Sequence, residues 1–184
     1  ISQANHLKKN IKFEKNYSKR IEVLTALMLT GLVFREYSEN YNIAVKELEK
    51  LVKKIFDQDG FPSTRNPSDL IFFSKYLIFC KECIIEAQEY IPEFLDSIII
   101  QNLACLKNIL TPNNQVPLFN GGSEENLQQF NEVVKKLNFK TKNIKNIIGG
   151  IQKFKFKNVN VYFDIGEPPE KKFSQSYQSG PLSF

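Results

Sequence analysis

The sequence predicts a mainly α-helical protein, built as a partial α/α toroid of antiparallel helix pairs and followed by the first strands of an antiparallel β-sheet domain. Two observations lead to this prediction. Before residue 110, apolar residues recur at helical spacing in segments that are separated by loops rich in Pro, Asn, Asp and Gly. After Gly149-Gly150 the apolar residues alternate instead, which is typical of a half-buried strand or hairpin.

The composition predicts a folded protein. Of 184 residues, 42% are hydrophobic and 24% are charged, which is typical of a globular chain and not of a disordered one. A chain of this length can bury one sizeable core. The apolar run 94–106 is interrupted by Asp96, Gln101 and Asn102, so we expect no membrane span.

Four helices are expected from the apolar periodicity and from the residues that start and stop them. The first covers 18–34 and the second about 42–56, and the short loop between them favours antiparallel packing. The third covers 67–90, because Asn66 can cap free amides while Pro67 occupies the first turn. The fourth covers 92–110.

A further helix is expected to open at Ser123, where Glu124 and Glu125 favour the positive end of the helix dipole. The sheet is expected next, and its apolar residues alternate with lysines and asparagines. These apolar residues are Phe154, Phe156, Val159, Val161 and Phe163. Because one or two strands cannot bury an apolar face alone, we expect further strands beyond Phe184 and a longer chain.

Two loops, 57–66 and 111–122, resemble each other. Each follows the second helix of a pair, contains proline within an Asn/Asp/Gly-rich turn, and brings an asparagine, Asn66 or Asn120, to the next helix pair. Helix pairs joined by functional loops at one end are typical of a toroid or solenoid, and a plain helix bundle is the alternative. The predicted domains are 1–146, helical, and 147–184, the start of the sheet.

Positive charge is concentrated in one part of the sequence. The net charge is +5, and the segment 133–163 contains eight lysines and no acidic residue. This field suits an anionic partner; the alternative is a solvated face whose lysines protect a strand edge. The lysines are Lys135, Lys136, Lys140, Lys142, Lys145, Lys153, Lys155 and Lys157.

The three cysteines, Cys80, Cys83 and Cys105, form no even disulfide framework. Cys80 and Cys83 make a C-x-x-C motif, but no second pair follows and the flanking residues are apolar. Buried thiols are therefore favoured over a metal or redox site. No metal and no cofactor are predicted, and His6 is expected to be an ordinary exposed histidine.

Four motifs resemble, in this order, the heparinase II/III-like polysaccharide lyases of proteobacteria. They are "DGFPSTRNP", "PLFNGG", "GGIQKFKFKNVNVYFDIGEPP" and "SYQSGPLSF", and the resemblance extends from about Asn16 to Phe184. It implies an incomplete α/α toroid followed by a β-sandwich, of which this chain would contain the last toroid helices and the first strands. It also implies a bacterial protein and leaves two locations as alternatives, the periplasm and the cytoplasm.

The resemblance implies β-elimination on an acidic, uronate-containing polysaccharide such as a glycosaminoglycan. Hydrogen-bond donors first neutralise the uronate carboxylate, which stabilises the charge that develops in the transition state. A positioned base then removes the proton beside the carboxylate, and an acid protonates the departing sugar oxygen. A lysine-rich rim would hold the anionic chain.

The catalytic residues implied by the resemblance are Asn16, Tyr17, Tyr177 and Gln178. Asn16 keeps the carboxylate-binding role, and Tyr17 stands where the family often has histidine. Tyr177-Gln178 stands where many members have Tyr-His or His-x-His, so that Tyr17 or Tyr177 would serve as the base. The alternative for both tyrosines is a packing role.

The substrate-binding residues implied by the resemblance are Arg65, Asn66 and Asn120. Each also has a purely structural interpretation: a surface cation for Arg65, a helix cap for Asn66 and a turn former for Asn120. The partner implied is an anionic polysaccharide, and the sequence leaves the oligomeric state open.

Two other functions compete with the lyase. A glycoside hydrolase would use two carboxylates, Asp57 with Asp59 or Asp59 with Asp164. A non-catalytic module would bind carbohydrate or nucleic acid through the lysine segment. Nucleic acid is disfavoured because the aromatic residues near these lysines fit the buried side of a strand rather than exposed stacking positions. These residues are Phe139, Phe154, Phe156 and Tyr162.

Overall fold

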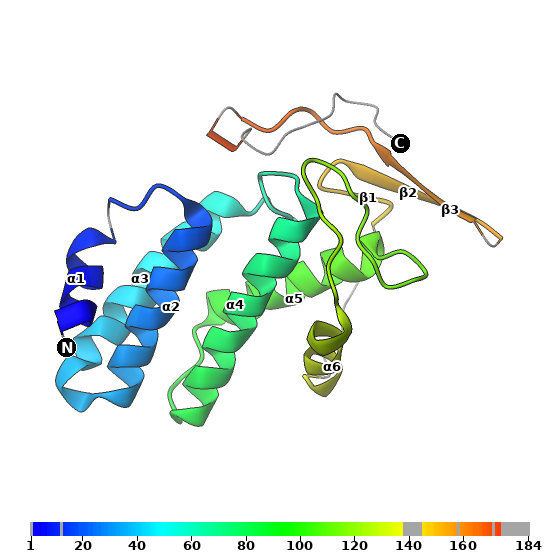
Figure 1. Ribbon diagram of the computed structural model, residues 1–184. Coiled ribbons are helices and arrows are strands. Elements are labelled where there is room, and N and C mark those ends of the chain that lie inside the picture. The colour runs from blue at the N-terminus through cyan, green and yellow to red at the C-terminus, as the bar shows by residue number, and fades with distance from the viewer. Residues whose placement is uncertain (1, 12, 138–144, 158, 171, 174–184) are drawn as a thin grey trace. The chain divides into compact units, whose positions relative to one another are not determined.

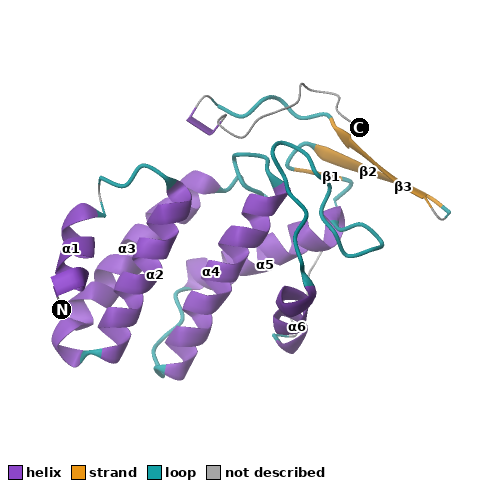
Figure 2. Cartoon of the chain, in the orientation of Figure 1, coloured by secondary structure: helices purple, strands orange, loops and turns teal. Residues whose placement is uncertain are grey.

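The computed structural model describes residues 2–11, 13–137, 145–157, 159–170 and 172–173. In this part the protein is mainly helical, with a small antiparallel sheet of three strands (Figures 1 and 2). None of the helices described combines the length and the apolar character that crossing a bilayer requires. The helices are α1 (Ser2–Asn10), α2 (Tyr17–Val33), the 3-10 turn η1 (Arg35–Tyr37), α3 (Ser38–Ile55), α4 (Pro67–Glu86), α5 (Glu93–Ile109) and α6 (Gln128–Lys136). The strands are β1 (Ile147–Ile148), β2 (Ile151–Phe156) and β3 (Val159–Asp164).

The chain divides into two compact units. The first unit contains residues 1–55 and 75–99, and the second contains 56–74 and 100–184. Helix α4 therefore contributes its first turns to the second unit and the remainder to the first. The second unit contains residues from both sides of position 146, the boundary that the sequence suggests.

In the first unit, α2 and α3 form an antiparallel pair joined by η1 (Figure 1). The apolar stripes that predict these helices are buried, including Ile21, Leu24, Leu27, Leu48 and Leu51. The pair approaches closely at Gly31, where an added Cβ would lie 2.8 Å from Tyr41 Cβ and 2.9 Å from Tyr41 Cα. Glycine is therefore the residue that allows this helix spacing.

In the second unit, loop 57–62 is folded back on itself. The Asp57 carboxylate accepts the main-chain N–H groups of Asp59 (2.9 Å) and Phe61 (2.8 Å), and Asn102 Nδ2 donates to the Gly60 carbonyl (2.6 Å). Phe61 is fully buried, and an added Cβ at Gly149 would overlap its ring. The loop thus brings an aromatic side chain into the core of this unit, against the turn that precedes β2.

The strands pair in the order β1-β2-β3, with antiparallel registers throughout. Paired residues share a face, so Phe154 with Val161 and Phe156 with Val159 lie on one side of the hairpin. The opposite face carries the pairs Lys153 with Tyr162, Lys155 with Asn160 and Ile151 with Asp164. The alternation that predicts the hairpin is confirmed.

The expectation that the phenylalanine face is the buried one is wrong. Phe154 is 38% exposed and Phe156 is 63% exposed, whereas Ile151 and Asp164 on the lysine face are buried. The lysine face is buried at Ile151 and Asp164, and it is partly covered by the end of α5, because Lys153 Nζ and the Tyr162 hydroxyl both donate to the Leu110 carbonyl at 3.0 Å. Alternation shows which residues share a face, but not which face is covered.

The expectation of a helix that opens at Ser123 is also wrong. Helix α6 begins at Gln128, whose main-chain N–H donates to Asn126 Oδ1 at 3.0 Å. Ser123 has another partner, because its N–H donates to Ser68 Oγ at 2.9 Å. The residues that suggest a helix start at 123 therefore belong to a loop that is tied to the beginning of α4.

Replacing Gly31 by alanine should destabilise the α2–α3 pair. The added methyl group would overlap the backbone and Cβ of Tyr41, and overpacking of this kind costs about 1–3 kcal/mol. Urea unfolding of Gly31→Ala against wild type measures the loss. Gly122→Ala, whose Cβ would lie 3.1 Å or more from its neighbours, is the matched control and should change stability less. Equal stability of Gly31→Ala and wild type would contradict the close approach.

Candidate functional site

Three segments far apart in the sequence meet at one buried ion pair in the second unit. Arg65 precedes α4 and is 8% exposed, and Asp164 ends β3 and is fully buried. Arg65 Nη2 donates to Asp164 Oδ1. The same guanidinium donates through Nε to the Gly149 carbonyl (3.0 Å) and through Nη1 to the Glu167 carbonyl (2.7 Å). One side chain thus binds both ends of the hairpin region.

Asn120 joins the second loop to this pair. Its Nδ2 donates to the main-chain carbonyl of Arg65 at 3.0 Å and to Asp164 Oδ2 at 3.1 Å. Asn120 is 1% exposed, and its Oδ1 is buried without a hydrogen-bond partner among the described residues. Loops 57–66 and 111–122 therefore lie side by side. The side chain of Asn120, in the second loop, joins it to the first.

Two residues of this cluster have left-handed backbone conformations. Arg65 has φ +58° and Asn120 has φ +53°. Asparagine tolerates this region, but for a residue such as arginine it is uncommon and costs free energy. Strained backbone of this kind persists where the surroundings fix it, and it occurs preferentially at functional sites. Here the hydrogen bonds of Asn120 and Asp164 fix it.

Glycines make room for the guanidinium. An added Cβ at Gly150 would lie 2.6 Å from Arg65 Nη2, and one at Gly166 would lie 2.5 Å from the same atom. Gly150 also has φ +77°, which disfavours any side chain. Both glycines belong to one of the motifs that carry the resemblance. The close approach of the Arg65 guanidinium explains why glycine occupies these two positions.

Asn66 and Ser68 link the start of α4 to the second loop. Asn66 Oδ1 accepts the main-chain N–H of Ser68 at 2.8 Å, as the helix-cap interpretation predicts. Ser68 Oγ in turn accepts the N–H of Ser123 and lies 3.3 Å from the Ser123 carbonyl oxygen. The three predicted substrate-binding residues, Arg65, Asn66 and Asn120, are thus brought together and are buried.

Asn16 and Tyr17 lie at the start of α2, in the first unit. Asn16 Oδ1 accepts the N–H of Lys19 at 3.1 Å and so caps the helix. Tyr17 is the first residue of α2, and Lys54 Nζ lies 5.1 Å from the centre of its ring. Tyr177 and Gln178 fall outside the described residues.

The carboxylates considered for hydrolysis have partners within the second unit. The Asp57 carboxylate holds the turn of loop 57–62, and burial raises its pKa despite the main-chain donors. Asp59 forms an ion pair with Lys145. The Asp164 carboxylate binds Arg65 and Asn120. All three carboxylates thus have a visible structural role.

A basic cavity of about 440 Å³ lies where the hairpin meets the end of α5. Lys153 Nζ donates to the carbonyls of Asn108 (3.2 Å) and Leu110 (3.0 Å), and burial lowers the pKa of Lys153. A lysine at this place offsets the negative end of the α5 dipole. The cavity is lined by Leu110, Thr111, Pro112, Lys153, Lys155, Lys157 and Asn160. No carboxylate is among these residues, so the cavity can attract anions.

The thiols are poor nucleophiles. Cys80 and Cys105 are buried, as expected, and burial raises the pKa of Cys80 to about 11 and that of Cys105 to about 12. Cys83 is partly exposed, and partial burial raises its pKa as well. Since the thiolate is the reactive form, these values disfavour redox or nucleophilic use. Among the described residues, no group of three or more His, Cys, Asp or Glu side chains could hold a metal ion.

The ion pair between Arg65 and Asp164 is not predicted from the sequence. Both residues belong to motifs that carry the resemblance, but nothing in the spacing pairs them. One signal was available: Asp164 is the first acidic residue after the lysine-rich segment, and it ends a strand. If the end of this strand is buried, a carboxylate at that position requires a cation nearby.

Comparison of the chain with family models, with curated proteins and with solved structures finds no match.

Replacing Arg65 by methionine should be strongly destabilising. The substitution leaves the Asp164 carboxylate buried without its cation, which costs about 3–5 kcal/mol for a buried pair. The free energy of unfolding in urea at pH 7 measures the loss. The double variant Arg65→Met/Asp164→Asn removes the buried charge and should recover part of it. Lys53→Met, which breaks an exposed pair with Glu49, is the control and should change stability by less than about 1 kcal/mol.

Asp69 should make the protein less stable as the pH rises. Burial raises the pKa of Asp69 above the ordinary 3.8, the charge of Glu125 adds to this, and the Thr64 hydroxyl (2.6 Å) partly opposes it. The folded protein then binds this proton more tightly than the unfolded chain does. The free energy of unfolding therefore declines as the pH rises from 3.8, the pKa in the unfolded chain, through the raised pKa of the folded protein.

Asp69→Asn should remove that decline, because the amide keeps an acceptor for Thr64 without a charge. The free energy of unfolding at pH 4 and at pH 7 should therefore fall less in Asp69→Asn than in wild type. Glu36→Gln, an exchange at an exposed site, controls for the loss of one carboxylate. An identical pH dependence in Asp69→Asn and wild type would refute the assignment.

Proposed function

We propose that this chain is part of a heparinase II/III-like polysaccharide lyase, with a partial α/α toroid, which cleaves an acidic, uronate-containing polysaccharide by β-elimination. One observation supports the proposal above others. Three of the motifs that carry the resemblance, residues 59–67, 117–122 and 149–169, share one cluster around Arg65, Asn120 and Asp164. Motifs that are separate in the sequence but joined in space are expected of parts of one site.

In this proposal the cluster holds together the two loops and the hairpin of the second unit. The guanidinium of Arg65 and the Nδ2 of Asn120 are engaged by protein groups, and Asn66 caps α4. Their role is to hold two loops and the hairpin in one arrangement, and a preformed arrangement of donors is what stabilises developing charge. The substrate-binding roles of these three residues remain predictions.

In this proposal the other candidate residues bind the uronate carboxylate and transfer the proton. Asn16 would donate to the uronate carboxylate, and Tyr17 or Tyr177 would remove the proton beside it, with Gln178 completing the hydrogen bonding. Positioned proton transfer of this kind contributes about 10²–10⁴-fold to a rate. Lys155 and Lys157, at the basic cavity, would attract the anionic polymer.

A second candidate is a non-catalytic module that binds the same kind of polymer. It is favoured by the burial of Arg65, Asn66 and Asn120, which leaves none of the three as an exposed donor. The basic cavity alone would account for binding. The two candidates differ in one measurable property, the formation of an unsaturated product.

Tyr17→Phe tests the proposal in an ultraviolet absorbance assay. β-Elimination creates an unsaturated sugar end that absorbs in the ultraviolet, and we expect this signal with at least one of polygalacturonate, alginate, hyaluronan and heparin. Without its phenol the base is lost, so Tyr17→Phe should reduce the rate by about 100-fold or more if Tyr17 is that base. Tyr37→Phe, on η1, is the matched control and should keep the wild-type rate.

The possible outcomes separate the candidates. Absorbance that depends on Tyr17 supports the lyase with Tyr17 as base. Absorbance that Tyr17→Phe leaves unchanged supports the lyase and assigns the base elsewhere, with Tyr177→Phe as the next variant. Retained binding to a polymer without any absorbance change would contradict the lyase and favour the binding module.

A further inference from the structure

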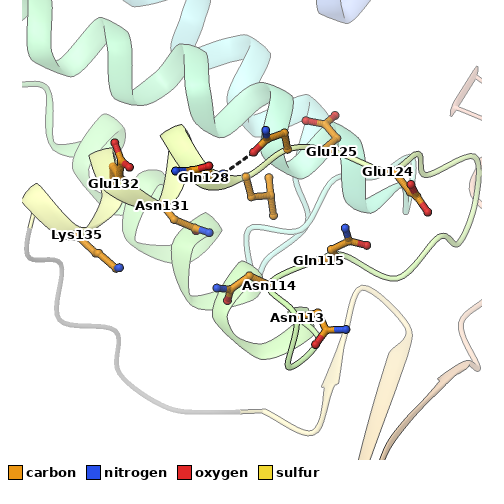
Figure 3. A pocket seen from close by; sticks show the side chains of 11 residues that line it. Asn113, Asn114, Gln115, Glu124, Glu125, Gln128, Asn131, Glu132 and Lys135 are labelled. Atoms are coloured by element: carbon orange, nitrogen blue, oxygen red, sulfur yellow. Dashed lines mark hydrogen bonds between the residues drawn. The ribbon is translucent and has the colours of Figure 1, made fainter.

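A second cavity also borders loop 111–116, and its chemistry differs from that of the basic cavity. It measures about 720 Å³ and lies between this loop and the segment that leads into α6 (Figure 3). All of its walls belong to the second unit. It is lined by Asn113, Asn114, Gln115, Glu124, Glu125, Asn126, Leu127, Gln128, Asn131, Glu132 and Lys135.

Six of these side chains are amides, and most of them are free to bind. Asn126 accepts the N–H of Gln128. Five amide side chains make no hydrogen bond to another described residue, and Figure 3 shows them on both walls of the cavity. They are Asn113, Asn114, Gln115, Gln128 and Asn131. Each amide offers two donors and an acceptor with two lone pairs, which matches hydroxyl groups that both donate and accept.

Hydrogen bonds and buried side chains hold the walls of the cavity. Thr111 donates its N–H to the Gln115 carbonyl (2.8 Å), and Asn114 donates its N–H to the Thr111 carbonyl (3.0 Å). Val116 anchors the loop and Leu127 anchors the approach to α6, and both are buried. The amides are therefore presented by ordered backbone, which lowers the entropy lost when a ligand binds.

The charge of the cavity argues against an anionic ligand. Among the lining residues, Glu124 and Glu132 outnumber Lys135, so the local field is negative. An apolar ligand is disfavoured as well, since Leu127 is the one apolar side chain among the lining residues and is itself buried. The amides match an uncharged ligand with many hydroxyl groups.

We propose that this cavity, between loop 111–116 and α6, binds an uncharged sugar unit through the amides of Asn114, Gln128 and Asn131 and their neighbours. The carboxylates of Glu124 and Glu132 accept further hydroxyl hydrogens. The proposal does not depend on lyase activity, because it concerns a different cavity and a different chemical class. With no aromatic ring among its lining residues, the site would be weak, with a dissociation constant on the order of 1 mM.

Saturation-transfer difference NMR on the full chain tests the proposal. The probes are maltotriose, cellotriose and N,N′,N″-triacetylchitotriose, with trigalacturonate as the anionic comparison. We expect transfer to at least one neutral trisaccharide. The double variant Gln128→Leu/Asn131→Leu removes two amides from the α6 wall, keeps good helix formers, and should weaken binding about tenfold or more. Gln129→Leu, on the neighbouring residue outside the cavity, is the matched control and should bind as wild type does.

Three results would overturn the proposal: no transfer to any neutral trisaccharide, transfer to trigalacturonate alone, or an equal loss in Gln129→Leu. Far-UV circular dichroism checks that the variants fold. If the double variant does not fold, Asn113→Ala on the opposite wall replaces it and should also weaken binding. Because the readout is binding of a neutral sugar, its failure leaves the absorbance test of the lyase unaffected.

Discussion

The arrangement of the second unit depends on a single buried guanidinium. Arg65 is bound by a carboxylate from β3 and by carbonyls from the turns on both sides of the hairpin, and its own carbonyl binds Asn120. A buried charge is tolerated when it is paired and its remaining donors are satisfied. Satisfying one arginine therefore fixes two loops and a sheet together, and the left-handed backbone at Arg65 and Asn120 follows from that requirement.

The sequence predicts helices α2 to α5 well because their signals are local. Apolar spacing and Pro67 place α2 to α5 within a few residues of their observed ends. What it does not predict depends on tertiary contacts. The alternation in 151–164 is independent of which face is covered, and that is decided by Lys153 and Tyr162 at the end of α5. Likewise Asn66 and Asn120 are predicted as a pair of loop residues, but the hydrogen bond of buried Asn120 to Asp164 is a tertiary contact that the local sequence does not show.

Loop 111–116 separates two cavities of opposite character. On one side Thr111 and Pro112 border the lysines of the hairpin, and on the other Asn113 to Gln115 border amides and carboxylates. A short loop can serve both because successive side chains of an irregular segment point in different directions. One unit therefore presents, within a few residues of each other in the sequence, a basic cavity and an amide-rich cavity.

The distance along the chain between Arg65 and Asp164, 99 positions, has a consequence for how the protein forms. Loop-closure entropy makes such remote pairings slow compared with local helix formation. On the ribosome, residues 1–55 and 75–99 emerge before β3 exists, so the first unit can assemble early. Until Asp164 is synthesised, the Arg65–Asp164 ion pair cannot form, and the contacts that fix loops 57–66 and 111–122 remain incomplete.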